Sequence, residues 1–215
     1  MTQKMKTYLF DFDGTLVNSM PTYASVMLKI LDEYGAEYPS DIIKIITPLG
    51  FIGTADYYVD VLGIKESREN LIAKMNEYCF EAYSTTVPAK EGVIEALTAL
   101  KKRGDSLNVL TASPHLTLDA CLKRLEIFDI FDNVWSCNDF GTTKADPNIY
   151  RMCAERLGKE VGEIIFLDDN YNADKTAKDA GMIVFGVFDE SSAEYTEQIK
   201  SITDGYITDF RELLS

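Results

Sequence analysis

Residues 8–16 read Tyr-Leu-Phe-Asp-Phe-Asp-Gly-Thr-Leu, and this stretch decides the fold. The apolar run from Thr7 to Phe10 predicts a short buried strand that ends at Asp11. The residues that follow, Asp13-Gly14-Thr15, are typical of a turn. In an extended chain, residues two positions apart point to the same side. The stretch therefore predicts a strand that delivers two carboxylates, Asp11 and Asp13, to one place.

Beyond about residue 86, short apolar strands alternate with helical segments. Strands are expected near residues 107–110, 134–135, 164–167, 183–187 and 206–207, and helices near residues 92–102, 116–125, 147–157 and 173–180. Such alternation predicts an α/β fold with a doubly wound, parallel, Rossmann-like sheet.

The block from residue 17 to residue 85 lacks strand-like alternation and shows helical spacing of apolar residues. Breaks are expected at Thr47-Pro48, Gly50, Gly53 and Gly63, with a loop over residues 48–53. We therefore expect an α/β core over residues 1–16 and 86–215, with an inserted helical domain over residues 17–85. Ligands bind at the carboxyl ends of parallel strands, so the insert is expected to act as a lid.

Polar residues follow several of the predicted strands. Asp11 and Asp13 follow the first, Thr111-Ala112-Ser113 follow the second, and Asp168-Asp169 follow the fourth, while Lys144 lies just before a helix. Carboxylates gathered at one sheet edge repel one another unless a cation joins them, and Mg²⁺ prefers carboxylate and phosphate oxygens. This set suits attack of a carboxylate on phosphorus, with a second carboxyl group as acid and base.

At this point the chain resembles the haloacid dehalogenase superfamily, in the branch with a helical cap that includes phosphoglycolate phosphatases and beta-phosphoglucomutases. Its first motif is matched at Asp11 to Thr15, its second at Thr111, and its lysine at Lys144. Its acidic motif is matched at Asp168-Asp169, with Asp174 further on. The motifs occur in the family's order and span almost the whole chain.

The resemblance implies roles for these residues. Asp11 is expected to be the nucleophile and a magnesium ligand, and Asp13 the acid and base, with its backbone carbonyl on the metal. Thr111 and the backbone N–H groups of Ala112 and Ser113 are expected to hold the phosphoryl group, and Lys144 to bridge it to Asp11. Asp169 is the expected metal ligand, with Asp168 as the alternative. Asp174 or Asn172 would support these ligands without contacting the metal.

Composition narrows the function further. The net charge of −14 disfavours nucleic acid, which needs a basic footprint, and no apolar run reaches the roughly 20 residues of a membrane span. Four cysteines without a Cys-x-x-Cys pair are typical of a reduced, cytoplasmic protein. The single histidine, His115, disfavours a Ser-His-Asp hydrolase and a zinc site. Its position after the second motif leaves a structural and a substrate-binding role open.

We therefore predict a Mg²⁺-dependent phosphatase that acts on a small phosphorylated metabolite through an aspartyl-phosphate. Asp13 argues against a dehalogenase or phosphonatase, since those relatives lack a carboxylate there. A phosphosugar mutase is the main alternative, disfavoured because residues 47–55 contain no basic side chain. A non-catalytic regulatory protein on the same fold is the alternative of another class. We expect a monomer or small homo-oligomer, with neither nucleic acid nor membrane as partner.

Overall fold

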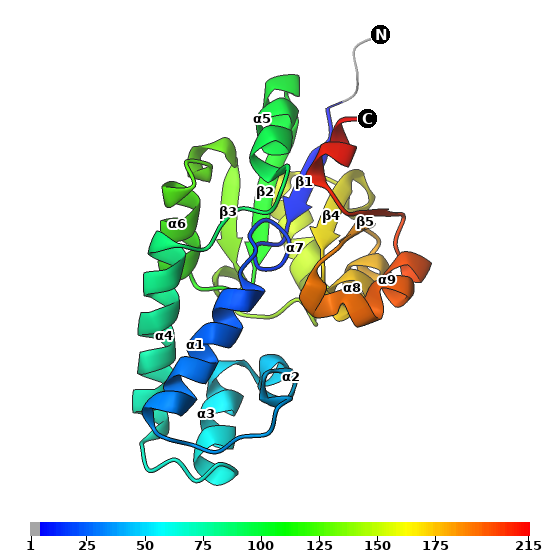
Figure 1. Cartoon of the computed structure of the whole chain (residues 1–215). Coiled ribbons are helices and arrows are strands. Elements are labelled where there is room, and N and C mark those ends of the chain that lie inside the picture. The colour runs from blue at the N-terminus through cyan, green and yellow to red at the C-terminus, as the bar shows by residue number, and fades with distance from the viewer. Residues whose placement is uncertain (1–4) are drawn as a thin grey trace. The chain divides into compact units, whose positions relative to one another are not determined.

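The computed structural model describes residues 5–215 and divides into two compact units. The α/β unit ends at Asn18 and resumes over Val87–Ser215, and the helical unit is Ser19–Thr86. Within the described residues, six strands form one parallel sheet in the order β3-β2-β1-β4-β5-β6 (Figure 1). The strands are β1 (Thr7–Phe10), β2 (Ser106–Thr111), β3 (Asn133–Ser136), β4 (Ile164–Asp168), β5 (Ile183–Val187) and β6 (Gly205–Ile207).

The chain order of the strands explains where the helices of the α/β unit lie. From β1 the sheet grows in one direction to β2 and β3, then in the other direction to β4, β5 and β6. Because parallel crossovers are right-handed, the two directions place their helices on opposite faces. One face carries α5 (Val93–Arg103) and α6 (His115–Arg124); the other carries α7 (Asn148–Leu157), α8 (Tyr171–Ala180) and α9 (Thr196–Ile202). The predicted doubly wound α/β fold is confirmed.

Strand β1 is the centre of the core, and each of its residues is buried. Leu9 aligns with Phe166 of β4, and both pack with Tyr150 of α7 in one apolar cluster. Phe10, on the other face, contacts the rings of Phe131 and of Phe210 near the C-terminus. Full burial of a side chain of this size contributes roughly 1.5–3 kcal/mol. This packing fixes the end of β1 against the end of β4.

The helical unit consists of α1 (Met20–Glu33), α2 (Ile42–Ile46), a 3₁₀ turn (Thr47–Leu49), α3 (Gly50–Asp60) and α4 (Arg68–Thr85). Helix α4 packs against α1 and α3, and the hydroxyl of Tyr58 donates to the carbonyl of Met27 at 3.1 Å. No helix among the described residues combines the length and the apolar character that a membrane crossing needs.

The predicted loop over residues 48–53 is wrong. Gly50, with a φ of 63°, opens α3, and Gly53 lies inside that helix instead of ending it. A Cβ at position 53 would lie 2.8 Å from the Cβ of Leu49, so glycine serves close packing there. A glycine that breaks a helix and one that relieves crowding look alike in a single sequence.

Two strand ends also differ from the prediction. Thr111 still pairs with Ser136 and is therefore the last residue of β2, and Asp168 still pairs with Gly186 and is the last residue of β4. Helix α8 starts at Tyr171, two residues early, because the side chain of Asn170 accepts hydrogen bonds from the first turn. The predicted strands ended too early because a polar side chain was interpreted as the end of a strand, although the backbone of that residue still pairs with the neighbouring strand.

Candidate active site

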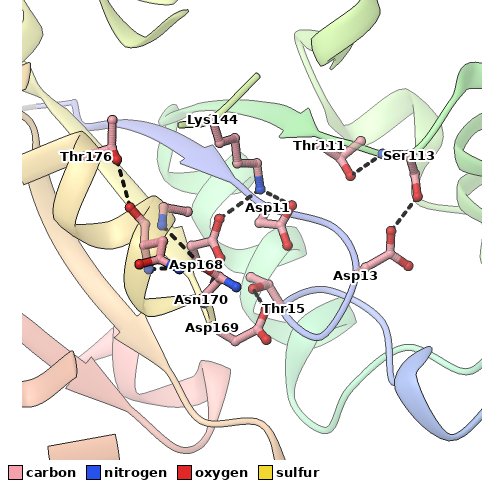
Figure 2. Close-up of polar contacts among 12 residues, drawn as sticks. Asp11, Asp13, Thr15, Thr111, Ser113, Lys144, Asp168, Asp169, Asn170 and Thr176 are labelled. Atoms are coloured by element: carbon pink, nitrogen blue, oxygen red, sulfur yellow. Dashed lines mark hydrogen bonds and ion pairs between the residues drawn. The ribbon is translucent and has the colours of Figure 1, made fainter. Parts of the chain in front are cut away.

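Three carboxylates meet where β1 and β4 end. The backbone N–H of Asp11 donates to the carbonyl of Leu167 at 2.8 Å, so the pairing of the strands continues to Asp11. This places Asp11 opposite Asp168, with Asp169 next along the chain (Figure 2). One oxygen of each of the three lies within 4.8 Å of the others, and all three residues are buried. The sheet therefore gathers a cluster of negative charge at its carboxyl edge.

Lys144 reaches this cluster from the turn before α7. Its ammonium group contacts the Oδ1 of Asp11 and lies 2.8 Å from the Oδ2 of Asp168 (Figure 2). The turn is fixed from α7, because the hydroxyl of Tyr150 lies 3.1 Å from the carbonyl oxygens of both Lys144 and Ala173. One buried cation thus links the ends of β1 and β4.

The pKa values of the cluster show that one lysine does not neutralise it. Burial raises the pKa of Asp11 to about 8; Lys144 acts against this, while Asp168 and Asp13 add to it. Burial and the charges of Asp168 and Asp11 hold the pKa of Asp169 well above its usual range. For Lys144, burial acts to lower the pKa, but the two aspartates outweigh it and the pKa is well above normal. A further cation would relieve this repulsion.

Asp168 and Asp169 differ in what their oxygens already contact. Asp168 uses Oδ2 for Lys144 and accepts the backbone N–H of Asn170 on Oδ1, both at 2.8 Å. Asp169 accepts the hydroxyl of Thr15 on Oδ1 at 3.0 Å. The Oδ2 of Asp169 therefore has the greater capacity for a new ligand. All atoms of the cluster that could bind a metal are carboxylate oxygens, which fits Mg²⁺ and not a metal that prefers nitrogen or sulfur.

Asp13 lies apart from the cluster and faces the end of β2. Its Oδ2 accepts a hydrogen bond from the hydroxyl of Ser113 (Figure 2). The backbone N–H of Ser113 donates to the Oγ1 of Thr111 at 3.0 Å, and Ala112 between them is exposed. The predicted phosphate-binding segment and the predicted acid and base are thus brought together. The contact between Ser113 and Asp13 has no signal in the sequence pattern.

A family model described as haloacid dehalogenase-like hydrolase matches residues 5–181. The chain belongs to the haloacid dehalogenase-like hydrolases. Pyrophosphatase PpaX of Bacillus velezensis is 32% identical, over 87% of this chain and 85% of that protein. A phosphorylated carbohydrates phosphatase of Thermotoga maritima is 27% identical, over 85% of each chain. The family resemblance and the prediction of a phosphatase are thereby confirmed.

Solved structures agree on the fold. CbbY of Rhodobacter sphaeroides, solved with xylulose bisphosphate, superposes with a TM-score of 0.81. The match covers 97% of this chain and 96% of that one, at 17% identity. Identity this low carries the fold alone, which is the parallel sheet with an inserted helical unit.

In this hydrolase, Gly14 is needed for close packing beside the cluster. Its φ of 74° is in the left-handed region, and a Cβ there would lie 2.6 Å from the Oδ2 of Asp169. The turn therefore packs directly against Asp169, and the hydroxyl of Thr15 donates a hydrogen bond to the same carboxylate. The sequence showed a turn here but not what the turn rests on.

Two further groups near the site were left open by the sequence. His115 lies between two carboxylates, with Nδ1 2.9 Å from Asp119 and Nε2 2.9 Å from Asp139. The hydrogen bond with Asp119 is the largest cause that raises the pKa of His115. Burial acts to lower this pKa, and Asp139 raises it further. The histidine therefore joins the start of α6 to the turn after β3.

The buried Asp174 has no hydrogen-bond partner on either carboxyl oxygen among the described residues. Burial, with the charges of Asp168 and Asp169, raises its pKa to about 10. Asp174 is therefore protonated at neutral pH in the metal-free protein.

Proposed function

We propose that this hydrolase is a Mg²⁺-dependent phosphatase that cleaves a small phosphate monoester through an aspartyl-phosphate on Asp11. One observation carries the proposal: Lys144 joins Asp11 to Asp168 beside Asp169, within a buried cluster of carboxylates. Such a cluster is costly to a fold unless it serves a cation and an anionic ligand.

Asp11, Asp169 and the backbone carbonyl of Asp13 would hold the metal. Asp168 is the less suitable ligand, because Lys144 and the N–H of Asn170 already use its two oxygens. When bound, Mg²⁺ supplies positive charge beside the nucleophile and the phosphoryl oxygens, which resolves how so acidic a site accepts an anion.

The protein groups account for both chemical steps. A carboxylate oxygen of Asp11 attacks phosphorus, the bond from phosphorus to the ester oxygen breaks, and Asp13 gives that oxygen its proton. Asp13, now a carboxylate, takes a proton from water as the water attacks the phosphorus of the aspartyl-phosphate. The acyl phosphate bond breaks, inorganic phosphate leaves, and both aspartates return to their first state. Lys144, Thr111 and the backbone at Ala112 and Ser113 hold the phosphoryl oxygens in place.

The substrate class follows from Asp13 and from the relatives. A group placed to protonate a leaving oxygen favours an ester whose alcohol leaves poorly without help. The relatives named above are a pyrophosphatase and a phosphatase of phosphorylated carbohydrates. A panel of sugar phosphates, phosphoglycolate and pyrophosphate, with phosphate detection, is therefore the direct way to the substrate. We propose a cytoplasmic enzyme with neither a nucleic acid nor a membrane as partner, in line with its net charge of −14.

The mutase alternative is separated by one incubation. The protein is given beta-glucose 1-phosphate with and without a sugar bisphosphate as primer. A phosphatase releases phosphate in both samples. Net isomerisation of the sugar phosphate without release of phosphate would contradict the proposal.

The main test is the release of 4-nitrophenol from 4-nitrophenyl phosphate with and without Mg²⁺. Wild-type protein is compared with Asp11→Asn and with Asp179→Asn, which makes the same change at an exposed carboxylate on α8. We expect activity in wild-type and Asp179→Asn protein only when Mg²⁺ is present, and none above background in Asp11→Asn. Equal rates in Asp11→Asn and wild type would rule out this nucleophile.

A further inference from the structure

A lysine outside the family motifs holds the turn that carries Asp13. The ammonium group of Lys90 donates to the backbone carbonyl of Gly14 at 2.6 Å, to the carbonyl of Phe188, and to the Oδ2 of Asp189 at 2.9 Å. An ammonium group has three N–H donors, and each of the three therefore has an oxygen acceptor. The side chain of Lys90 is 17% exposed and that of Asp189 is 5% exposed, so this is a largely buried arrangement.

The backbone of Lys90 is fixed as firmly as its side chain. Its N–H donates to the carbonyl of Leu16 at 3.0 Å, and Val17 and Ala89 form an antiparallel bridge beside it. The N–H of Asn18 donates to the carbonyl of Pro88 at 2.9 Å. The two segments where the chain leaves and re-enters the α/β unit therefore lie side by side, and Lys90 is part of that pairing.

These contacts converge on one short turn. Lys90 holds the carbonyl of Gly14, and the Cα of Gly14 lies against the carboxylate of Asp169, where no Cβ fits. The N–H of Gly14 also donates to the carbonyl of Val17 at 3.0 Å. The residue just before Gly14 is Asp13, so a shift of the Gly14 peptide moves the backbone of Asp13.

We propose that Lys90 is a positioning residue for Asp13. It ties the Gly14 carbonyl to the loop at Phe188 and Asp189, and so sets where the acid and base stands relative to Asp11. Lys90 acts through the turn and has no assigned contact with the substrate or the reacting atoms. The inference rests on the proposed function, because it assigns Asp13 the role of proton donor.

The predicted signature is a dependence on the leaving group. Phenol leaves less readily than 4-nitrophenol, so phenyl phosphate needs the proton from Asp13 more than 4-nitrophenyl phosphate does. Lys90→Met removes the three hydrogen bonds. Because a general acid contributes roughly 10²–10⁴-fold, we expect kcat/KM for phenyl phosphate, which reports the step that breaks the ester bond, to fall at least about tenfold. For 4-nitrophenyl phosphate we expect kcat/KM to fall by about threefold or less. A fall in kcat that is equal for the two esters reports the second step, in which Asp13 acts as base on the same aspartyl-phosphate.

Two further variants separate positioning from folding. Lys178→Met is the matched control. Lys178 makes an ion pair with Asp204, whose carboxylate also accepts the N–H of Val184 near the start of β5. This ion pair therefore lies at the amino ends of the strands, away from the site. The double variant Lys90→Met/Asp189→Asn removes the lysine without leaving a buried carboxylate unpaired. Circular dichroism and thermal melting establish that each variant is folded.

The experiment measures kcat and KM for both esters, at saturating Mg²⁺, in wild type, the three variants and Asp11→Asn. The inference predicts a raised ratio of kcat/KM for 4-nitrophenyl phosphate to kcat/KM for phenyl phosphate in both Lys90 variants, and a wild-type ratio in Lys178→Met. A wild-type ratio in either Lys90 variant would overturn it. Activity in Asp11→Asn would instead refute the proposed function itself, so the two failures are distinguishable.

Discussion

Replacement of Lys144 by methionine removes the only positive charge that contacts the carboxylate cluster within the described residues. Methionine keeps much of the length of the side chain and its apolar part, so the change is mainly one of charge. Asp11 and Asp168 then lose their shared partner while remaining buried.

The magnitude follows from the geometry. At 2.8 Å, the pair of Lys144 and Asp168 has a Coulomb energy of about 6 kcal/mol in an effective dielectric of about 20. Desolvation offsets part of this, and breaking a buried pair typically costs about 3–5 kcal/mol. Asp11, whose pKa is raised to about 8, is already largely protonated at neutral pH without metal, so the loss comes mainly from the pair with Asp168. We therefore expect about 3 kcal/mol at neutral pH without metal, which lowers Tm by roughly 6–12 °C.

The effect on activity is larger than that on folding. In the Mg²⁺-loaded protein Lys144 favours the carboxylate form of Asp11, which is the nucleophile, and gives the phosphoryl oxygens a fixed cation. Both are lost in the variant, so kcat should fall by at least ~10²-fold. The assay is hydrolysis of 4-nitrophenyl phosphate at saturating Mg²⁺, below the Tm of the variant. Lys178→Met is the control, and its half-exposed pair should contribute about 1 kcal/mol at most. A folded Lys144→Met protein with the kcat of wild type would rule out a catalytic role for Lys144.

Three further predictions concern the same cluster. Because the pKa of Asp11 is raised to about 8, the metal-free folded state keeps a proton that the unfolded chain loses, so stability falls as pH rises from about 5 to 8. Melting curves should show this fall and a larger gain from Mg²⁺ at the higher pH; equal gains at both ends would contradict it. Gly14→Ala places a Cβ 2.6 Å from the Oδ2 of Asp169 and should weaken Mg²⁺ binding at least about tenfold, as measured by calorimetry. A wild-type affinity for Mg²⁺ in this variant would contradict the prediction. Asp174, with a pKa of about 10, is uncharged at neutral pH, so Asp174→Asn should change the Tm of the metal-free protein by less than about 4 °C, and a larger loss would count against a protonated Asp174.

Strand β1, the parallel sheet and the meeting of carboxylates at its edge could be predicted from the sequence. The apolar run that ends at Asp11 identifies β1, because a central strand buried on both faces must be apolar throughout. The alternation of helices and strands after residue 86 predicts the parallel sheet, since each strand must be covered on both faces. The carboxyl ends of such strands meet at one edge, which is why Asp11 and Asp168 could be expected together.

Other features depend on contacts that no local pattern records. Gly53 ended a helix in the sequence pattern, but in the structure it lets α3 pass close to Leu49. The contacts that distinguish Asp169 from Asp168, one with Thr15 and the other with Lys144, are not visible in the sequence pattern. No sequence pattern marks Lys90, because Gly14 and Asp189 approach it only in the folded chain.

In the proposed mechanism, Asp11 carries the phosphoryl group during turnover. Wild-type protein is mixed with 4-nitrophenyl phosphate and Mg²⁺, quenched in acid within the turnover time, digested, and examined by peptide mass spectrometry. We predict one added phosphoryl group on the peptide that contains Asp11, and its absence from Asp11→Asn and from samples without Mg²⁺. Turnover with no phosphorylated peptide, or with the phosphoryl group on a residue other than Asp11, would rule out Asp11 as the nucleophile.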